Sequence, residues 1–237
     1  HNHINVSSNI STLEDPKENI ITKIINHFPS KINTGLDITI QKTIPMGAGM
    51  GGGSSNAAGV LVGLNTLFDL GLTEEELMSV GAKYGADIPF FIRGGRALVS
   101  GYGEKIDTIE KSIESHYVII NPGIHMSTKE IYNGFDSLED IKVTPTNALM
   151  QKVRQSPIGE NDLKNVAMSK SAALRKIEST LIENLNKDIY MTGSGSTLFI
   201  PVESKEEGQK VSKVCSQLFP DFLVQCVFSV NKGSKRV

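Results

Sequence analysis

The sequence predicts an α+β protein of two domains, on three observations. The chain has 237 residues, which is long for one domain. Short stretches that alternate apolar and polar residues, typical of half-buried strands, are separated by stretches with helical periodicity. In the second half these follow one another as helix, strand, helix and strand, an order typical of an open sheet covered by helices. We place the two domains at residues 1–113 and 114–237.

Composition excludes several classes of protein. Hydrophobic residues make up 39% of the chain and charged residues 21%, which argues against a disordered protein. The net charge of −2 argues against an extended nucleic-acid-binding face, which would need a basic excess. The longest apolar run, residues 57–64, spans about eight residues, whereas a membrane-spanning helix needs about twenty. We therefore expect neither a nucleic-acid partner nor a membrane segment.

The two cysteines indicate a reducing compartment. Cys215 and Cys226 form no Cys-x-x-Cys pair and have no histidine at metal-ligand spacing. We expect two small, unpaired thiols and a cytoplasmic protein.

The predicted elements of the first half surround a run of glycines. Alternation predicts a strand over 36–44, which Pro45 ends, and residues 46–53 are too rich in glycine for a helix or strand interior. We predict a helix from an N-cap within 54–56 to about residue 70, and a second helix that opens at the Thr73–Glu76 capping box. A strand is expected over 96–100.

The second half is predicted to contain four strands and three helices. Strands are expected over 117–120, 189–191, 197–201 and 222–230. Helices are expected over 128–134, 162–186 and 206–218, and a loop over 136–147.

The glycine run predicts an anion site. Five glycines between Gly47 and Gly53 allow backbone N–H groups to converge, and the next helix points its positive end to the same place. The run lacks the Walker A pattern, and the chain has no H-R-D or D-F-G element of a protein kinase. Its match to the dinucleotide-binding pattern is weak, because a second helix follows where that fold needs a strand.

Three motifs, in order, resemble those of the GHMP small-molecule kinases. They are the loop with its helix start at residues 45–58, Gly-Ala-Asp-Ile-Pro-Phe-Phe at 85–91, and Met-Thr-Gly-Ser-Gly-Ser at 191–196. The middle motif, with Arg-Gly-Gly at 93–95 and Gly-Tyr-Gly-Glu at 101–104, is similar to the branch that acts on 4-diphosphocytidyl-2-C-methyl-D-erythritol. The resemblance covers the chain from about Asn19 to Val230.

The resemblance implies a fold and a reaction. The fold would be the two-lobed GHMP kinase fold, with an N-terminal ATP-binding lobe like ribosomal protein S5 and a C-terminal, ferredoxin-like substrate lobe. The reaction would move a phosphoryl group from ATP, with Mg²⁺, to the 2-hydroxyl of 4-diphosphocytidyl-2-C-methyl-D-erythritol in non-mevalonate isoprenoid synthesis. The partner would be this small molecule with its cytidine diphosphate group. The protein would be a monomer or homodimer in the bacterial cytoplasm, or in the plastid stroma of a plant or alga.

The resemblance also implies site residues. Asp87 would be catalytic, since transfer to an alcohol needs a group that accepts the hydroxyl proton. Thr128, Tyr132, Gly193 and Ser194 would contact the acceptor, with Tyr132 stacked on the cytosine. Residues that would bind ATP are Asn19, Lys42, Pro45, Met46, Gly47, Ala48, Gly49, Met50, Gly51, Gly52, Gly53, Ser54 and Ser55. No magnesium ligand can be nominated.

The pattern departs from the family at its start. The family opens with a strand carrying Ala-Lys-(Ile/Leu)-Asn-Leu and then a Gly-Tyr-His element, and neither precedes Asn19 here. We therefore expect an upstream segment of roughly fifty residues beyond the chain as given. Three alternatives stay open: another GHMP kinase, a nucleotide-binding homologue without kinase activity and, last, a dinucleotide-binding oxidoreductase.

Overall fold

The computed structural model describes residues 3–10, 19–32, 34–109, 114–138, 148 and 160–234. The chain divides into two compact units, and each takes its residues from separate parts of the sequence. Unit 1 consists of His1–Ile44, Gly51–Ser112 and Val230–Val237, and unit 2 of Pro45–Met50 and Ile113–Ser229. The glycine run is therefore shared, because its first residues belong to unit 2 and its last residues to unit 1.

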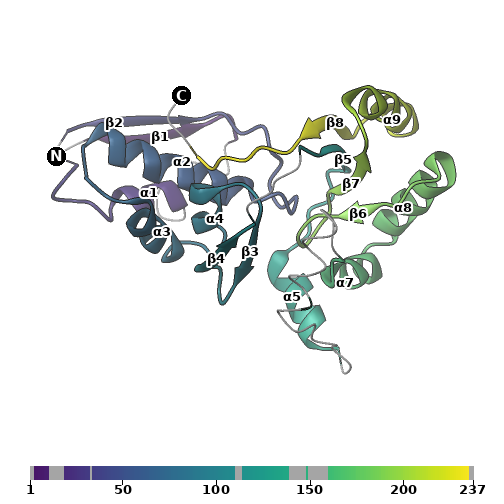
Figure 1. Cartoon of the computed structure of the whole chain (residues 1–237), viewed down its shortest axis with the longest axis horizontal. Helices are drawn as coiled ribbons and strands as arrows, with labels where there is room; N and C mark the ends of the chain where they lie inside the picture. Colours follow the sequence, from purple (N-terminus) through teal and green to yellow (C-terminus); the bar gives the residue numbers. More distant parts are fainter. Residues whose placement is uncertain are drawn as a thin grey trace. The chain divides into compact units, whose positions relative to one another are not determined.

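Unit 1 packs helices against two small sheets. Strands β1 (Ile4–Ser8) and β2 (Leu36–Ile40) pair in parallel, and β3 (Ala97–Ser100) pairs antiparallel with β4 (Lys105–Thr108). Its helices are α1 (Ile20–Ile25), α2 (Gly52–Leu67), α3 (Glu74–Ala82) and α4 (Ile88–Arg93). Figure 1 shows α1, α2 and α3 gathered along one side of the β1–β2 pair. The core between them is aliphatic and includes Ile24, Leu61 and Ile88, each fully buried.

The C-terminal segment completes unit 1. The backbone N–H of Gly233 donates to the carbonyl of Arg93 at 3.1 Å, and that of Ser234 donates to Phe91 at 2.7 Å. Because the last carbonyls of a helix have no partner within it, these bonds satisfy the end of α4. A Cβ added to Gly94 would overlap Gly233, so the two segments lie in close contact.

Unit 2 is built on a four-stranded antiparallel sheet with the order β6-β7-β5-β8. The strands are β5 (His116–Asn121), β6 (Tyr190–Met191), β7 (Leu198–Val202) and β8 (Leu223–Phe228). The helices are α5 (Thr128–Asp136), α7 (Leu163–Lys170), α8 (Ala172–Leu185) and α9 (Lys205–Leu218) (Figure 1). Along β7, Leu198, Ile200 and Val202 are buried in alternation, and side chains from all four helices join them in a second core.

The α+β architecture is confirmed, and most predicted elements appear near their expected positions. Two predictions were wrong. Helix α2 begins at Gly52, inside the glycine run, because Gly51 takes the left-handed conformation (φ 63°) of its N-cap. The stretch 162–186 forms two helices, because Ser171 is extended and its hydroxyl caps α8 by accepting from the N–H of Leu174. Residues 139–147 of the predicted loop lie outside the described residues.

The cysteines match the expectation of unpaired thiols. Cys215 and Cys226 are both unpaired, and Cys215 is fully buried in the core of unit 2. Among the helices that the structure describes, none combines the length and the apolar character needed to cross a membrane.

Candidate active site

The first half of the glycine run is held by the turn between β6 and β7, within unit 2. The hydroxyl of Thr192 donates to the carbonyl of Gly49 at 2.9 Å. Gly49 has φ +69°, and a Cβ there would overlap the Thr192 carbonyl and lie 2.8 Å from that of Gly195. Only glycine allows this approach without strain. The first and third motifs are therefore in direct contact.

The second half of the run forms the start of α2, within unit 1. Its N-cap, Gly51, has no side chain to satisfy the first N–H groups of the helix. Uncapped N–H groups at a helix start carry partial positive charge and attract phosphate. The hydroxyl of Ser55 donates to the carbonyl of Gly52 at 3.2 Å. The geometry suits an anion site made mainly of backbone.

Lys42 lies against the start of α2. A Cβ added to Gly52 would be 2.5 Å from the Lys42 Nζ atom. Partial burial lowers the pKa of this amine from its ordinary value of 10.5. Its backbone is held by Asn9, which accepts from the Lys42 N–H at 2.7 Å and donates to its carbonyl at 3.1 Å. These side-chain bonds replace the sheet after Ile40, which explains why β2 is shorter than predicted.

Asp87 stands exposed at the N-cap position of α4, yet its side chain makes no capping hydrogen bond. The next turn of this helix packs on the glycine run, because a Cβ at Gly51 would lie 2.5 Å from the Phe91 ring. Unit 1 thus places the helix that carries Asp87 against the start of α2.

The Gly-Tyr-Gly-Glu element at 101–104 supports the loop before Asp87. A Cβ at Gly103 (φ +111°) would overlap the backbone of Ala86, so the two turns touch. The Glu104 carboxylate accepts from the Tyr102 N–H at 2.7 Å, and backbone N–H bonds lower the pKa of this acid. This element therefore supports the backbone of the loop that precedes Asp87.

Four other predicted residues come together or stand close in unit 2. The hydroxyls of Thr128, on α5, and Ser194 lie 3.1 Å apart. Gly193 packs on the glycine run, since its Cβ would be 2.8 Å from the Gly49 carbonyl. Tyr132 lies one helical turn beyond Thr128, and 51% of its surface is exposed, so its ring is not packed in a core. This leaves an aromatic face open beside the Thr128–Ser194 pair.

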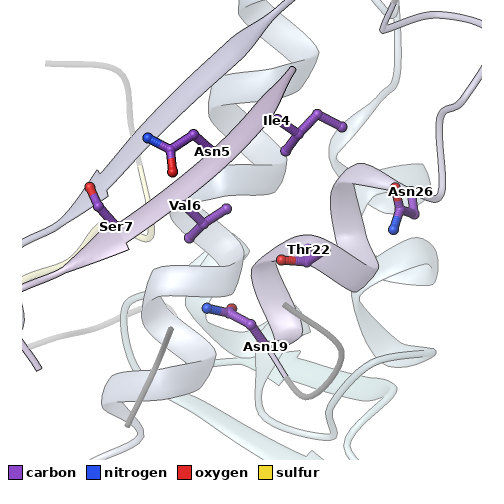
Figure 2. A pocket seen from close by; sticks show the side chains of 7 residues that line it. All are labelled: Ile4, Asn5, Val6, Ser7, Asn19, Thr22 and Asn26. Carbon is purple, nitrogen blue, oxygen red and sulfur yellow. The ribbon is translucent and has the colours of Figure 1, made fainter. Parts of the chain in front are cut away.

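Asn19 caps α1 and borders a pocket of about 410 Å³ in unit 1 (Figure 2). Its Oδ1 accepts from the N–H of Ile21 at 2.9 Å, so part of its side chain is structural. The pocket lies between α1, which supplies Asn19, Thr22 and Asn26, and residues 4–7 of β1. The Thr22 hydroxyl is buried without a hydrogen-bond partner among the described residues.

Sequence reasoning missed His125. A Cβ at Gly47 would overlap the imidazole of His125, so this exposed ring lies against the glycine run in unit 2. His125 follows the Asn-Pro-Gly turn at 121–123, but nothing in its local sequence signals the contact. Within the described part of the chain, no three acidic, cysteine or histidine side chains gather as a metal site.

The comparisons with known proteins agree with this geometry. The family model of the GHMP kinase N-terminal domain matches residues 19–95. A 4-diphosphocytidyl-2-C-methyl-D-erythritol kinase of Clostridioides difficile is 38% identical over 214 residues, which cover 86% of this chain and 72% of that protein. One from Alkaliphilus oremlandii is 33% identical and covers 93% and 79%.

Solved structures share the fold. The crystal structure of a 4-(cytidine 5'-diphospho)-2C-methyl-D-erythritol kinase matches with a TM-score of 0.75 at 23% identity, over 97% of this chain and 83% of that one. A homoserine kinase from Cytophaga hutchinsonii matches with a TM-score of 0.69 at 16% identity, over 99% and 83%. Fold and motifs together define a small-molecule kinase of the GHMP class. Within that class, the chain belongs to the family of the 4-diphosphocytidyl-2-C-methyl-D-erythritol kinases. A dinucleotide-binding oxidoreductase is thereby excluded.

Proposed function

We propose that the protein phosphorylates 4-diphosphocytidyl-2-C-methyl-D-erythritol on its 2-hydroxyl with ATP, in the non-mevalonate route to isoprenoid precursors. The observation that carries the proposal is sequence identity of 33–38% to kinases of this name over most of the chain. The contact between Gly49 and the 192–196 turn supports it, since this turn also bears Ser194.

The proposed ATP site uses the glycine run at residues 45–55. Its backbone N–H groups, with the hydroxyls of Ser54 and Ser55, would hold the phosphates, and Asn19 and Lys42 would lie by the adenosine. Mg²⁺ would neutralise phosphate charge when bound. It usually takes one or two protein carboxylates and keeps several waters, so a site with few protein ligands suits it.

The proposed transfer needs one proton acceptor. The substrate oxygen forms a bond to the γ-phosphorus, the bond from that phosphorus to the β,γ-bridging oxygen breaks, and ADP leaves. Asp87 would orient the hydroxyl and take its proton. Thr128, Gly193 and Ser194 would hold the acceptor, and Tyr132 would stack on the cytosine, a contact worth roughly 1–3 kcal/mol.

The proposed setting is the bacterial cytoplasm, with the protein acting as a monomer or homodimer. Residues 1–113 would form the ATP-binding lobe and residues 114–237 the substrate-binding lobe, except that Pro45–Met50 belong to unit 2 and Val230–Val237 to unit 1.

The test is ADP release when the whole native protein is mixed with Mg-ATP and this substrate. Turnover supports the proposal. Turnover only with mevalonate or homoserine would assign the chain to another GHMP activity. ATP binding without ADP release from any acceptor would favour a nucleotide-binding homologue without kinase activity.

A further inference from the structure

In the part of the chain that the structure describes, side chains and not another strand cover the outer edge of strand β6. Strand β6 pairs with β7 on one side and is the last strand of the sheet. Carbonyls at alternate positions of a strand point to the same edge. On the outer edge of this segment, the carbonyls of Ile189, Met191 and Gly193 all accept hydrogen bonds from two side chains at the start of α7.

Asn161 makes two of these three bonds. Its Nδ2 atom lies 2.8 Å from the carbonyl oxygen of Met191 and 2.8 Å from that of Gly193. Its Oδ1 accepts from the N–H of Leu163 at 3.0 Å, which fixes the orientation of the amide. Lys164 adds the third bond, from Nζ to the Ile189 carbonyl at 2.7 Å. Asn161 therefore has an acceptor for each of its two side-chain N–H donors, and its oxygen is held by Leu163.

The turn that Asn161 holds contacts two predicted parts of the active site. Beside Gly193, the Thr192 hydroxyl donates to Gly49 of the glycine run. On the other side, Ser194 pairs with Thr128 at the start of α5. Ser194 is buried, so it cannot shift without the turn.

We propose that Asn161 is a positioning residue of this kinase: its amide fixes the Gly193–Ser194 turn in the geometry that receives the phosphoryl acceptor. The inference rests on the proposed function, since it assumes that Ser194 and Thr128 meet the acceptor. Asn161 acts only through the turn, and a displacement of about 1 Å at such a turn can lower catalysis by about 100-fold.

The test, in the whole native protein, is a substitution that removes the N–H donors of Asn161 and keeps the size of its side chain. In Asn161→Asp one carboxylate oxygen still accepts from the Leu163 N–H, but the other takes the place of Nδ2 and repels the carbonyl oxygens of Met191 and Gly193. The matched control is Asn184→Asp on α8, which removes one bond from an exposed Asn to the Thr180 carbonyl at 2.8 Å. We expect the KM for the acceptor to rise about tenfold or more in Asn161→Asp, and to stay within twofold in Asn184→Asp. Loss of folded enzyme alone would lower the apparent kcat and leave this KM unchanged.

A second readout does not depend on the reaction. Hydrogen exchange of the backbone N–H groups at 192–197 should be faster in Asn161→Asp by about tenfold, and unchanged in Asn184→Asp. Unchanged exchange, or an unchanged KM in an active Asn161→Asp enzyme, overturns the inference. If the native protein releases no ADP with this acceptor, the proposed function fails, and the exchange measurement alone decides whether Asn161 holds the turn.

Discussion

Asp87 occupies the N-cap position of α4 without capping the helix. An Asp before a helical turn usually accepts from a backbone N–H, and that bond would explain its presence structurally. Here the carboxylate makes no such bond, while the loop before it is supported by Gly103 and the helix after it by Phe91. These contacts fix the backbone around Asp87, and the carboxylate has no capping role in the helix.

Replacing Asp87 by Asn should therefore abolish turnover and leave stability nearly unchanged. The amide has no proton affinity to accept the hydroxyl proton, a role worth about 100- to 10,000-fold in rate. No capping bond is lost, so the free energy of unfolding should change by less than about 0.5 kcal/mol. ADP release and urea unfolding measure the two effects. Asp107→Asn, on exposed strand β4, is the control, and turnover retained in Asp87→Asn would remove Asp87 from the mechanism.

Gly49 and Gly59 form a pair with opposite expected effects on substitution by Ala. At Gly49 the positive φ and the Thr192 carbonyl leave no room for a Cβ, so the glycine run must shift. We expect a stability loss of about 1–3 kcal/mol and weaker ATP binding. Gly59 lies on α2 with open space around it, so Ala should stabilise the protein by about 0.5–1 kcal/mol. Calorimetric ATP titration and urea unfolding measure both, and equal effects at the two sites would contradict the geometry.

At the scale of elements, α3 opens with a complete capping box. Thr73 accepts from the Glu76 N–H at 3.2 Å, and the Glu76 carboxylate accepts from the Thr73 N–H at 2.8 Å. Thr73→Ala should lower the free energy of unfolding by about 1 kcal/mol at neutral pH. The control is Thr66→Ala, which removes an exposed hydroxyl inside α2 that caps neither end of the helix, and should cost little.

The same box predicts a pH dependence. The backbone N–H of Thr73 and then its hydroxyl lower the pKa of Glu76 in the folded protein. A group with a lowered pKa stabilises the fold above its ordinary value of 4.5 and loses that contribution as the pH falls through the folded value. Glu76→Gln keeps an accepting oxygen but does not titrate. The stability advantage of the native protein over this variant should therefore shrink below about pH 4.5 in urea unfolding, and a constant difference would refute the role.

Elements whose ends are marked by side chains could be predicted from sequence. The Thr73–Glu76 box predicted the start of α3, and alternation of apolar and polar residues predicted β2. The start of α2 could not be found in this way, because Gly51 uses a left-handed backbone and not a side chain. Strand β1 was also missed, although Ile4, Asn5, Val6 and Ser7 alternate between apolar and polar residues. Helical periodicity runs through Ser171, so the break between α7 and α8 became visible only in the cap.

The site could be predicted only as far as motifs mark it. The three motifs identified the glycine run, Asp87 and the 191–196 turn, and the contact of Gly49 with Thr192 shows why two of them contain glycines. His125 and Asn161 were missed, because their contacts are with residues distant in sequence. His125 lies against Gly47, and Asn161 bonds to Gly193.

At the scale of the whole molecule, each unit has its own hydrophobic core. The reactivity of the Cys215 thiol shows whether the core of unit 2 is intact, because this residue is buried in it. Burial raises the pKa of its thiol to about 11, so the folded protein keeps it protonated and unreactive near pH 8. In Cys226→Ser, which leaves one thiol, labelling by a disulfide reagent should be slow until urea unfolds unit 2. Rapid labelling without urea would show that the core opens locally. Because the folded pKa is raised, stability should fall as the pH rises above the ordinary value of 9.0.

The last described residues of the chain donate hydrogen bonds to the carbonyls of Phe91 and Arg93. They therefore limit when unit 1 can complete its folding during synthesis. A ribosome makes the polypeptide from its N-terminus, and domains usually fold in that order. Here Val230–Val237 belong to unit 1 but emerge after all of unit 2. Until Gly233 and Ser234 have been synthesised, the carbonyls at the end of α4 lack these hydrogen-bond donors. The unit that begins first is therefore the one completed last.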